Sequence, residues 1–211
     1  MMNQKGVRLM RGNTVFSSIK DTTLVEKRRD QIIQSAITLF KQKGFHRTTT
    51  REIAKEAGFS IGTLYEYIRT KEDVLLLVYE SINDHVYQHL EKLTDVVEPS
   101  LADLITIIDS YYRFIDKMQD EVLILYQEIK SLESNARKKV LQEERKQVLM
   151  LKSAIIGAVP YEISEEEAEI LANNILIHGH MWGFRRWTLH KNYTIDQYIE
   201  MQTKLLLQTI R

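Results

Sequence analysis

One short pattern recurs along this chain and constrains its fold more than any other feature. A Ser or Thr is followed three residues later by Asp, Glu or Gln, close to the start of a run of apolar residues at three-and-four spacing. In such a capping box the hydroxyl and the acidic or amide side chain bind free backbone N–H groups at the start of a helix. The capping boxes are Thr49–Glu52, Thr70–Asp73, Ser100–Asp103, Ser164–Glu167 and Thr194–Gln197. No stretch alternates as a strand, so the sequence predicts an all-α protein with about nine helices.

The extent of each expected helix follows from these starts and from the Gly and Pro residues that stop helices. Gly44 and Gly58 end the first two segments, and Pro99 and Pro160 interrupt later ones. The expected helices cover about residues 24–43, 49–57, 60–68, 70–98, 100–117, 120–132, 134–158, 164–189 and 194–211.

Composition excludes several classes of protein. The chain has no Cys, which excludes disulfide frameworks, thiolate metal sites and cysteine nucleophiles. No apolar run approaches the roughly 18 residues of a membrane span, and we expect a cytoplasmic protein without a signal peptide. His85 and His89 are four residues apart but lack a clear third ligand, and no nucleophile or phosphate-binding motif is present. We therefore expect no metal, no cofactor and no enzymatic activity.

Charge divides the chain into two blocks. Residues 1–71 hold 14 basic and 6 acidic side chains, whereas residues 72–211 hold 15 basic and 23 acidic ones, so the net charges of +8 and −8 cancel. A basic block suits an anionic partner, and an acidic block is repelled by phosphate. The sign change predicts a domain boundary near residue 71, between a candidate DNA-binding domain at 23–71 and a second helical domain at 72–211. Residues 1–22 show no sustained periodicity and hold four basic side chains, so we expect them to form a mobile basic arm.

The segment between Glu52 and Tyr65 has the layout of a helix-turn-helix. Small and apolar residues allow its two short helices to pack closely, and Gly58 suits the turn between them. Ser60, Ile61, Gly62 and Thr63 lie at the start of the second helix, where free N–H groups and short side chains can meet phosphates and base edges.

At these residues the chain resembles the tetracycline-repressor (TetR) family of transcriptional regulators. The similar stretches are Arg29–Ala36, Leu39–Phe45, Thr48–Ala54 and Gly62–Leu75, with Ile68 where the family usually has Phe. The resemblance covers about a quarter of the chain, all of it near the helix-turn-helix.

The resemblance implies which residues meet DNA. Thr50, as the cap of the first helix of the motif, would contact the backbone together with Tyr65, Tyr67 and Lys71. Ser60 to Thr63 would lie in or beside the major groove. Further cations that suit phosphates are Arg28, Arg29, Arg47 and Arg51, and in the arm Lys5, Arg8, Arg11 and Lys20. The alternative for each arginine is a solvated surface charge, and for the arm it is disorder without a function. For Tyr65 and Tyr67 the alternative is packing in the core, and we expect DNA contact for at least one of them.

The second domain is expected to dimerise and to sense a ligand. The resemblance implies a homodimer formed by the last two long helices, which would place two recognition helices about one DNA turn apart on a palindromic operator. Apolar residues on these helices support the interface, with an intramolecular core as the alternative. They are Ile170, Leu171, Ile175, Ile177, Leu205, Leu206 and Ile210.

Polar and aromatic groups within the apolar helices suggest an effector pocket. The candidates are Tyr79, Tyr111, Tyr126, Gln127, Glu128, His178 and Trp182, with Tyr112, Phe114, His180 and Trp187 also considered. Plain core packing is the alternative for each aromatic side chain. Gly179 and Gly183 either admit a neighbouring helix or leave room for a ligand. The stretch from Tyr126 to Leu132 is similar to family members that regulate fatty-acid metabolism in response to acyl-CoA, which implies a lipophilic effector.

The sequence as a whole predicts a ligand-responsive, homodimeric repressor. Ligand binding would stabilise a spread of the recognition helices that no longer matches successive grooves, with the long helix after Thr70 as the lever. Two other hypotheses remain open at this point. One is a helical ligand-binding or protein-interaction module that does not bind an operator, and the other is a helical enzyme.

Overall fold

The computed structural model describes residue 15, residues 17–19 and residues 21–209, and every element in that part of the chain is helical. This confirms the all-α class. The ten α-helices are α1 (Thr22–Lys43), α2 (Thr50–Glu56), α3 (Ile61–Tyr65), α4 (Lys71–Thr94), α5 (Leu101–Lys117), α6 (Gln119–Glu128), α7 (Ser134–Ala158), α8 (Glu165–Phe184), α9 (Arg186–Leu189) and α10 (Ile195–Thr209), with a 3-10 turn at Ile129–Ser131 after α6.

The capping boxes explain where most of the long helices start. In each of those at Thr49, Thr70, Ser100 and Ser164 the hydroxyl accepts an N–H bond from the third helical residue, whose carboxylate accepts the N–H of the cap in return. Thr194 forms the same pair of bonds with Gln197 at the start of α10. The sequence pattern therefore fixes these helix starts.

Several expected helix boundaries are wrong: the helix expected to reach residue 98 ends at Thr94, and the one expected to reach residue 132 ends at Glu128. The helix expected from Asp120 begins at Gln119 without a side-chain cap. The helix expected through Ile68 ends at Tyr65, because the chain then turns inward to bury Tyr67 and Ile68. The helix expected through Leu189 is interrupted after Phe184, and α9 folds back so that the His190 ring stacks on Trp182 at 4.0 Å between ring centroids.

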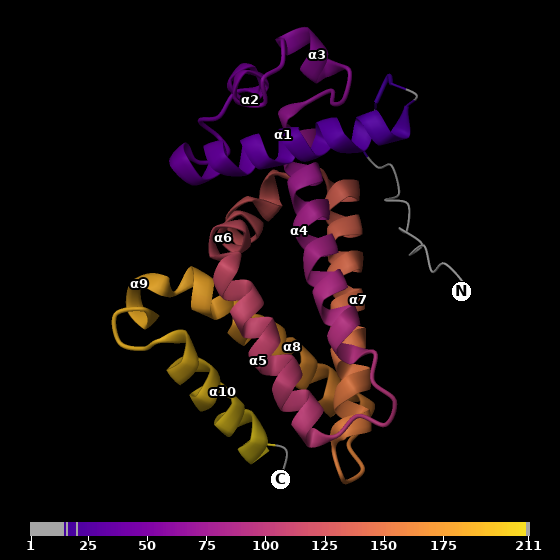
Figure 1. Cartoon of the computed structure of the whole chain (residues 1–211), viewed down its shortest axis with the longest axis vertical. Helices are drawn as coiled ribbons and strands as arrows, with labels where there is room; N and C mark the ends of the chain where they lie inside the picture. Colours follow the sequence, from indigo (N-terminus) through magenta and orange to yellow (C-terminus); the bar gives the residue numbers. More distant parts are fainter. Residues whose placement is uncertain (1–14, 16, 20, 210–211) are drawn as a thin grey trace, which may run out of the picture.

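The helices form a small N-terminal unit on one end of a larger bundle. Figure 1 shows α1 lying across the ends of α4 and α7, with α2 and α3 beyond it. The helices α4 and α7 run side by side, α8 crosses behind α5, and α10 lies along the outer side of α5 (Figure 1). No helix in the described part of the chain is long and apolar enough to cross a membrane.

Two apolar clusters fill this arrangement, and their division does not follow the charge boundary at residue 71. The first cluster includes α1–α3 and continues along α4 to Ile82, where Leu125 and Val140 also join it. The second begins on α4 at Val86 and on α7 at Val148. Polar side chains lie between the two clusters, and we call this set the polar seam. It consists of Asn83, Tyr126, Glu144, Gln147, His180 and the hydroxyl group of Tyr111, whose ring belongs to the second cluster.

Candidate nucleic-acid interface

The two helices of the motif are fixed by a cap, a turn and a small core. Thr49 caps α2, and Gly58 takes φ of +73°, a left-handed conformation that a Cβ would strain. Ile53, Ala54 and Leu64 are buried between the helices. The N-terminus of α3 is thereby held on the outside of the unit.

The residues at the N-terminus of α3 have few roles inside the protein. The Ser60 hydroxyl accepts the Thr63 N–H at 3.0 Å and lies 2.9 Å from the Thr63 hydroxyl. Gly62 is exposed, and a Cβ placed on it would meet only Ser60 Oγ, at an ordinary contact distance of 3.6 Å. Nothing in the described part of the chain requires glycine here, so the open space at Gly62 is available to a partner molecule.

Thr50 and Tyr65 lie together on the same outer side. The Tyr65 ring is 47% exposed, and its hydroxyl lies 3.2 Å from the Thr50 hydroxyl. The expectation that Thr50 caps the first helix of the motif is wrong, because Thr49 is the cap and Thr50 is the first helical residue. Arg51 follows on α2 and is exposed.

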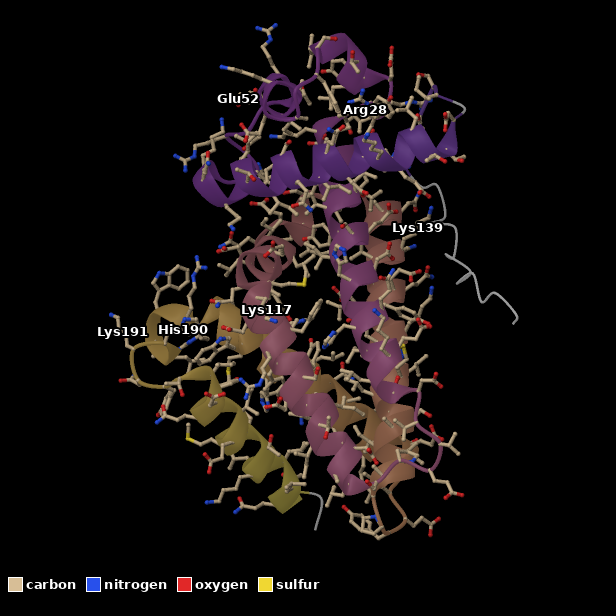
Figure 2. The ribbon with its side chains drawn as sticks, in the orientation of Figure 1. Arg28, Glu52, Lys117, Lys139, His190 and Lys191 are labelled. Atoms are coloured by element: carbon tan, nitrogen blue, oxygen red, sulfur yellow. The ribbon has the colours of Figure 1, made fainter. Side chains whose placement is uncertain are left out.

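Two of the residues considered for DNA contact are buried instead. Tyr67 is only 3% exposed, so the alternative of core packing holds for it. Arg29 is buried as well, and its guanidinium donates to the Val15 carbonyl. Arg28 remains at the surface, where it lies over the Phe59 ring and donates to Gln31. Figure 2 shows Arg28 at the same end of the molecule as Glu52.

Lys71 directs its ammonium into the protein. Its Nζ donates to the carbonyls of Phe45 at 3.0 Å and His46 at 3.3 Å, and lies 4.2 Å from the centroid of the Phe45 ring. These contacts tie the start of α4 to the chain that follows α1. Arg47 also binds inward, donating to the Lys43 carbonyl at 2.7 Å.

An ion pair connects α1 with α2. Lys43 Nζ lies 2.5 Å from Glu52 Oε1, and the hydrogen bond from Lys43, with those from Thr49, lowers the pKa of Glu52 to about 2. The carboxylate therefore stays ionised at any pH at which the protein works. It both completes the capping box and orients α2 on α1.

Part of the expected mobile arm is anchored. Val15 is buried, and Ser17 and Ser18 donate to the Glu66 carbonyl at the end of α3. Residues 15 and 17–19 are thus held against the motif, contrary to the expectation of mobility throughout 1–22. The basic residues expected in the arm, Lys5, Arg8, Arg11 and Lys20, lie outside the described residues.

Several effector-pocket candidates meet in the bundle. The His180 ring lies between two tyrosines, with Tyr111 Oη 3.0 Å from Nε2 and Tyr126 Oη 3.0 Å from Nδ1. Burial lowers the pKa of His180 to about 4, so the imidazole is neutral, and burial raises the pKa of Tyr126 to about 12. Tyr79 is fully buried near this group, and its hydroxyl donates to the Leu125 carbonyl.

The remaining candidates lie elsewhere. Gln127 is exposed, and Glu128 lies 3.4 Å from His46 of the N-terminal unit. Trp182 is buried and donates to Asp116 Oδ1 at 2.6 Å. His178 is half-buried, and its backbone carbonyl accepts from Tyr198. These four residues do not join the group around His180.

Gly179 resolves one alternative left open by the sequence. A Cβ at this position would lie 2.7 Å from Cε1 of Tyr111. The glycine therefore admits a neighbouring helix, with α8 packed directly against the α5 tyrosine.

Sequence reasoning missed an ion cluster that links three helices. Asp120 of α6 lies 2.9 Å from Lys41 Nζ of α1 and 2.6 Å from Arg186 Nη1 of α9. The three residues are far apart in the sequence, and no spacing rule connects them. The structure also has an open groove of about 630 Å³ between α5 and α10, lined by Ile199 and Thr203 among others, which includes none of the effector candidates.

Comparison with known proteins places this fold among DNA-binding regulators. The family described as bacterial regulatory proteins, tetR family, matches residues 32–78. HTH-type transcriptional regulator HbdR of Aromatoleum sp. (strain CIB) is 27% identical over 92% of this chain and 86% of that protein. HTH-type transcriptional repressor KstR2 of Rhodococcus jostii (strain RHA1) is 30% identical over 58% of this chain and 60% of that protein.

A solved structure extends the likeness to the whole fold. The crystal structure of AibR in complex with isovaleryl coenzyme A and operator DNA superposes with a TM-score of 0.69 at 19% identity, covering 84% of this chain and 97% of that one. The fold and the exposed α3 define a helix-turn-helix transcriptional regulator. Residues 32–78, which include the helix-turn-helix, match the tetR family of bacterial regulatory proteins, and over most of its length the chain is similar to a transcriptional regulator. The relatives named above are transcriptional regulators and not enzymes.

Proposed function

We propose that this protein is a homodimeric repressor that binds a palindromic operator and releases it on binding a small lipophilic effector. It would act in the cytoplasm, in a regulatory and not an enzymatic role. The observation that carries the proposal is the outward-facing N-terminus of α3, where Gly62 has open space and no internal reason to be glycine.

The proposed DNA contacts form one surface. Ser60, Ile61, Gly62 and Thr63 would enter the major groove from the N-terminus of α3. Thr50, Arg51 and Tyr65 would meet the backbone beside it, since all three lie at or near the outer side of the motif. Tyr67 is left out because it is buried, and Lys71 because its ammonium binds carbonyls.

The test is to select bound fragments from the source genome and to measure their affinity across salt concentrations. A regulator of this kind binds a palindromic site with an affinity that falls steeply with added salt. Absence of salt-dependent binding to any fragment would favour a ligand-binding or interaction module instead.

The proposed dimer uses α8 and α10. Ile170 and Ile177 of α8 are 62% and 39% exposed, and Leu205 of α10 is 57% exposed, which leaves large apolar side chains in solvent in a single chain. Sedimentation equilibrium tests this interface. Replacing Ile170 and Leu205 by Glu should give a folded monomer that no longer binds the full operator, whereas a dimer that persists would contradict the assignment.

The proposed effector site lies in the bundle beneath α1. Support comes from the cluster of Tyr111, Tyr126 and His180, and from AibR, which is described with isovaleryl coenzyme A. An acyl-CoA or a similar lipophilic compound is the proposed effector. Ligand binding would change the spread of the two recognition helices, with α4 as the lever because it runs from the motif into the bundle (Figure 1).

A further inference from the structure

The polar seam interrupts what would otherwise be one continuous apolar core. On α4 the first cluster ends at Ile82 and the second begins at Val86, with Asn83 between them. On α7 the corresponding residues are Val140 and Val148, and Glu144 lies between them, one helical turn from each. Residues at this spacing share one face of a helix, so Glu144 occupies a position on the core-facing stripe of α7.

One group in the seam is not satisfied within the described part of the chain. Asn83 Oδ1 accepts a long bond of 3.4 Å from Gln147 Nε2, while the buried Asn83 Nδ2 has no partner among the described residues. The Glu144 side chain is half-buried and no residue in the same part of the chain forms a hydrogen bond or ion pair with its carboxyl, so it is an accessible acceptor and not a buried group without a partner. A buried polar group without a partner is costly, which points to a partner from outside the chain.

The seam also lacks a positive charge. His180 is neutral because burial lowers its pKa to about 4. The cations next to Glu144 on α7 are bound elsewhere, Arg145 to Glu169 of α8 and Lys146 to Glu143 on the outer surface. Burial raises the pKa of the Tyr79, Tyr111 and Tyr126 hydroxyls, and the charge of the nearby Glu144 carboxyl raises the pKa of each further. An anion entering here would meet a carboxyl and neutral groups only.

We propose that the effector places an uncharged amide in the polar seam, with its N–H donating to Glu144 and its carbonyl accepting from Asn83 Nδ2. The inference rests on the proposed function, in which the bundle binds a lipophilic effector, and it specifies the chemistry of the buried polar group. An amide carries both a donor and an acceptor, so it can bind Glu144 and Asn83 at the same time. A carboxylate head satisfies Asn83 only and is repelled by Glu144. Amides of this kind occur in the pantetheine arm of an acyl-CoA, so a thioester effector presents one where a free fatty acid does not.

The test compares two probes with the same chain, octanamide and octanoate, by calorimetric titration of the full-length protein near neutral pH. S-octanoyl-N-acetylcysteamine, an uncharged thioester with one amide, is the third probe and separates a thioester source from a simple amide. We expect both amides to bind at least about tenfold more tightly than octanoate. Equal affinities, tighter binding of octanoate or no binding of either amide overturns the inference.

Two variants that change the net charge equally test whether Glu144 causes the preference for octanamide over octanoate. Glu144→Gln should narrow the preference for octanamide over octanoate to about twofold, because the repulsion of the carboxylate is lost while the side-chain size is kept. Glu143→Gln changes the net charge equally on the exposed side of α7 and should leave the preference unchanged. If Glu144→Gln retains the full preference, Glu144 does not select the ligand and the inference fails.

Two further measurements keep the result interpretable. Thermal unfolding shows whether each variant is folded, and the comparison of probes on the unaltered protein needs no variant. Operator binding without any probe tests the proposed function by itself. A protein that binds its operator and still prefers octanoate overturns only the inference on the amide.

Discussion

The two ends of α4 are buried in different ways. Near its start the helix packs Val74, Leu75 and Val78 into an apolar cluster, and the polar residues of the neighbouring motif lie on the outside. Further along, the same helix directs Asn83 into the polar seam. The DNA-facing region can therefore keep an ordinary apolar core, because its function lies on its surface. The bundle holds polar groups inside, which lowers its stability, and in the proposed function these groups bind the effector.

The largest effect that tests this contrast is expected at Leu64. It is fully buried between α2 and α3, so Leu64→Ala should cost about 2 to 5 kcal/mol of unfolding free energy and abolish operator binding. Denaturant unfolding measures the loss. Leu149→Ala, at a half-exposed site on α7, should cost far less. Equal losses for the two variants would show that the N-terminal unit has no conventional core.

A smaller loss is expected at Gly179, within the bundle. A methyl group there would meet the Tyr111 ring at 2.7 Å, so Gly179→Ala should cost about 1 to 3 kcal/mol by overpacking. Thermal unfolding of the dimer measures the effect. An unchanged midpoint would mean that α5 and α8 separate easily at this point.

Gly62→Ala makes the same glycine-to-alanine change on the surface of the N-terminal unit instead of inside the bundle. The space at Gly62 is open, and alanine favours a helix, so stability should rise by up to about 1 kcal/mol. Operator binding should weaken by about 1 to 3 kcal/mol, because the methyl group enters the surface that meets base edges. Fluorescence anisotropy with the selected operator measures the affinity. Full operator affinity in this variant would remove Gly62 from the DNA surface.

The smallest effect is expected at Lys71. Its ammonium binds two carbonyls inside the unit, so Lys71→Ala should cost about 1 kcal/mol of stability and leave the salt dependence of operator binding unchanged. Arg51→Ala is the matched control, since loss of one phosphate contact lowers the salt slope by about one. A reduced slope for Lys71→Ala would restore Lys71 as a phosphate contact.

Local signals predicted the fold well. The capping boxes at Thr49, Thr70, Ser100 and Ser164 mark real helix starts, because both bonds of a capping box lie within four residues of sequence. The start of α6 was misplaced, because no side chain caps it. The end of α8 was misplaced because a contact between distant residues, the stacking of His190 on Trp182, accompanies the fold-back of α9.

The candidate site was predicted in part, because local sequence signals identify residue types and tertiary packing decides which of them are exposed. The residue types at the start of α3 were identified from spacing alone, and whether they contact DNA remains a prediction. Exposure was not predictable, as Tyr65 and Tyr67 are two residues apart and only Tyr67 is buried. Glu144 gave no sequence signal, since one acidic residue on a long charged helix resembles an ordinary surface residue. Its importance depends on which face of α7 meets α4, which is settled by tertiary packing.

The ion cluster at Asp120 has a mechanical consequence. The Asp120 carboxylate on α6 forms ion pairs with a lysine of α1 and an arginine of α9. It therefore connects three helices from different parts of the sequence. A rotation of α6 that exceeds the reach of the Lys41 and Arg186 side chains either moves a neighbouring helix with it or breaks one of the two ion pairs. The position of α1 therefore depends on the position of α6 in the bundle as well as on the hydrophobic contacts of α1 itself.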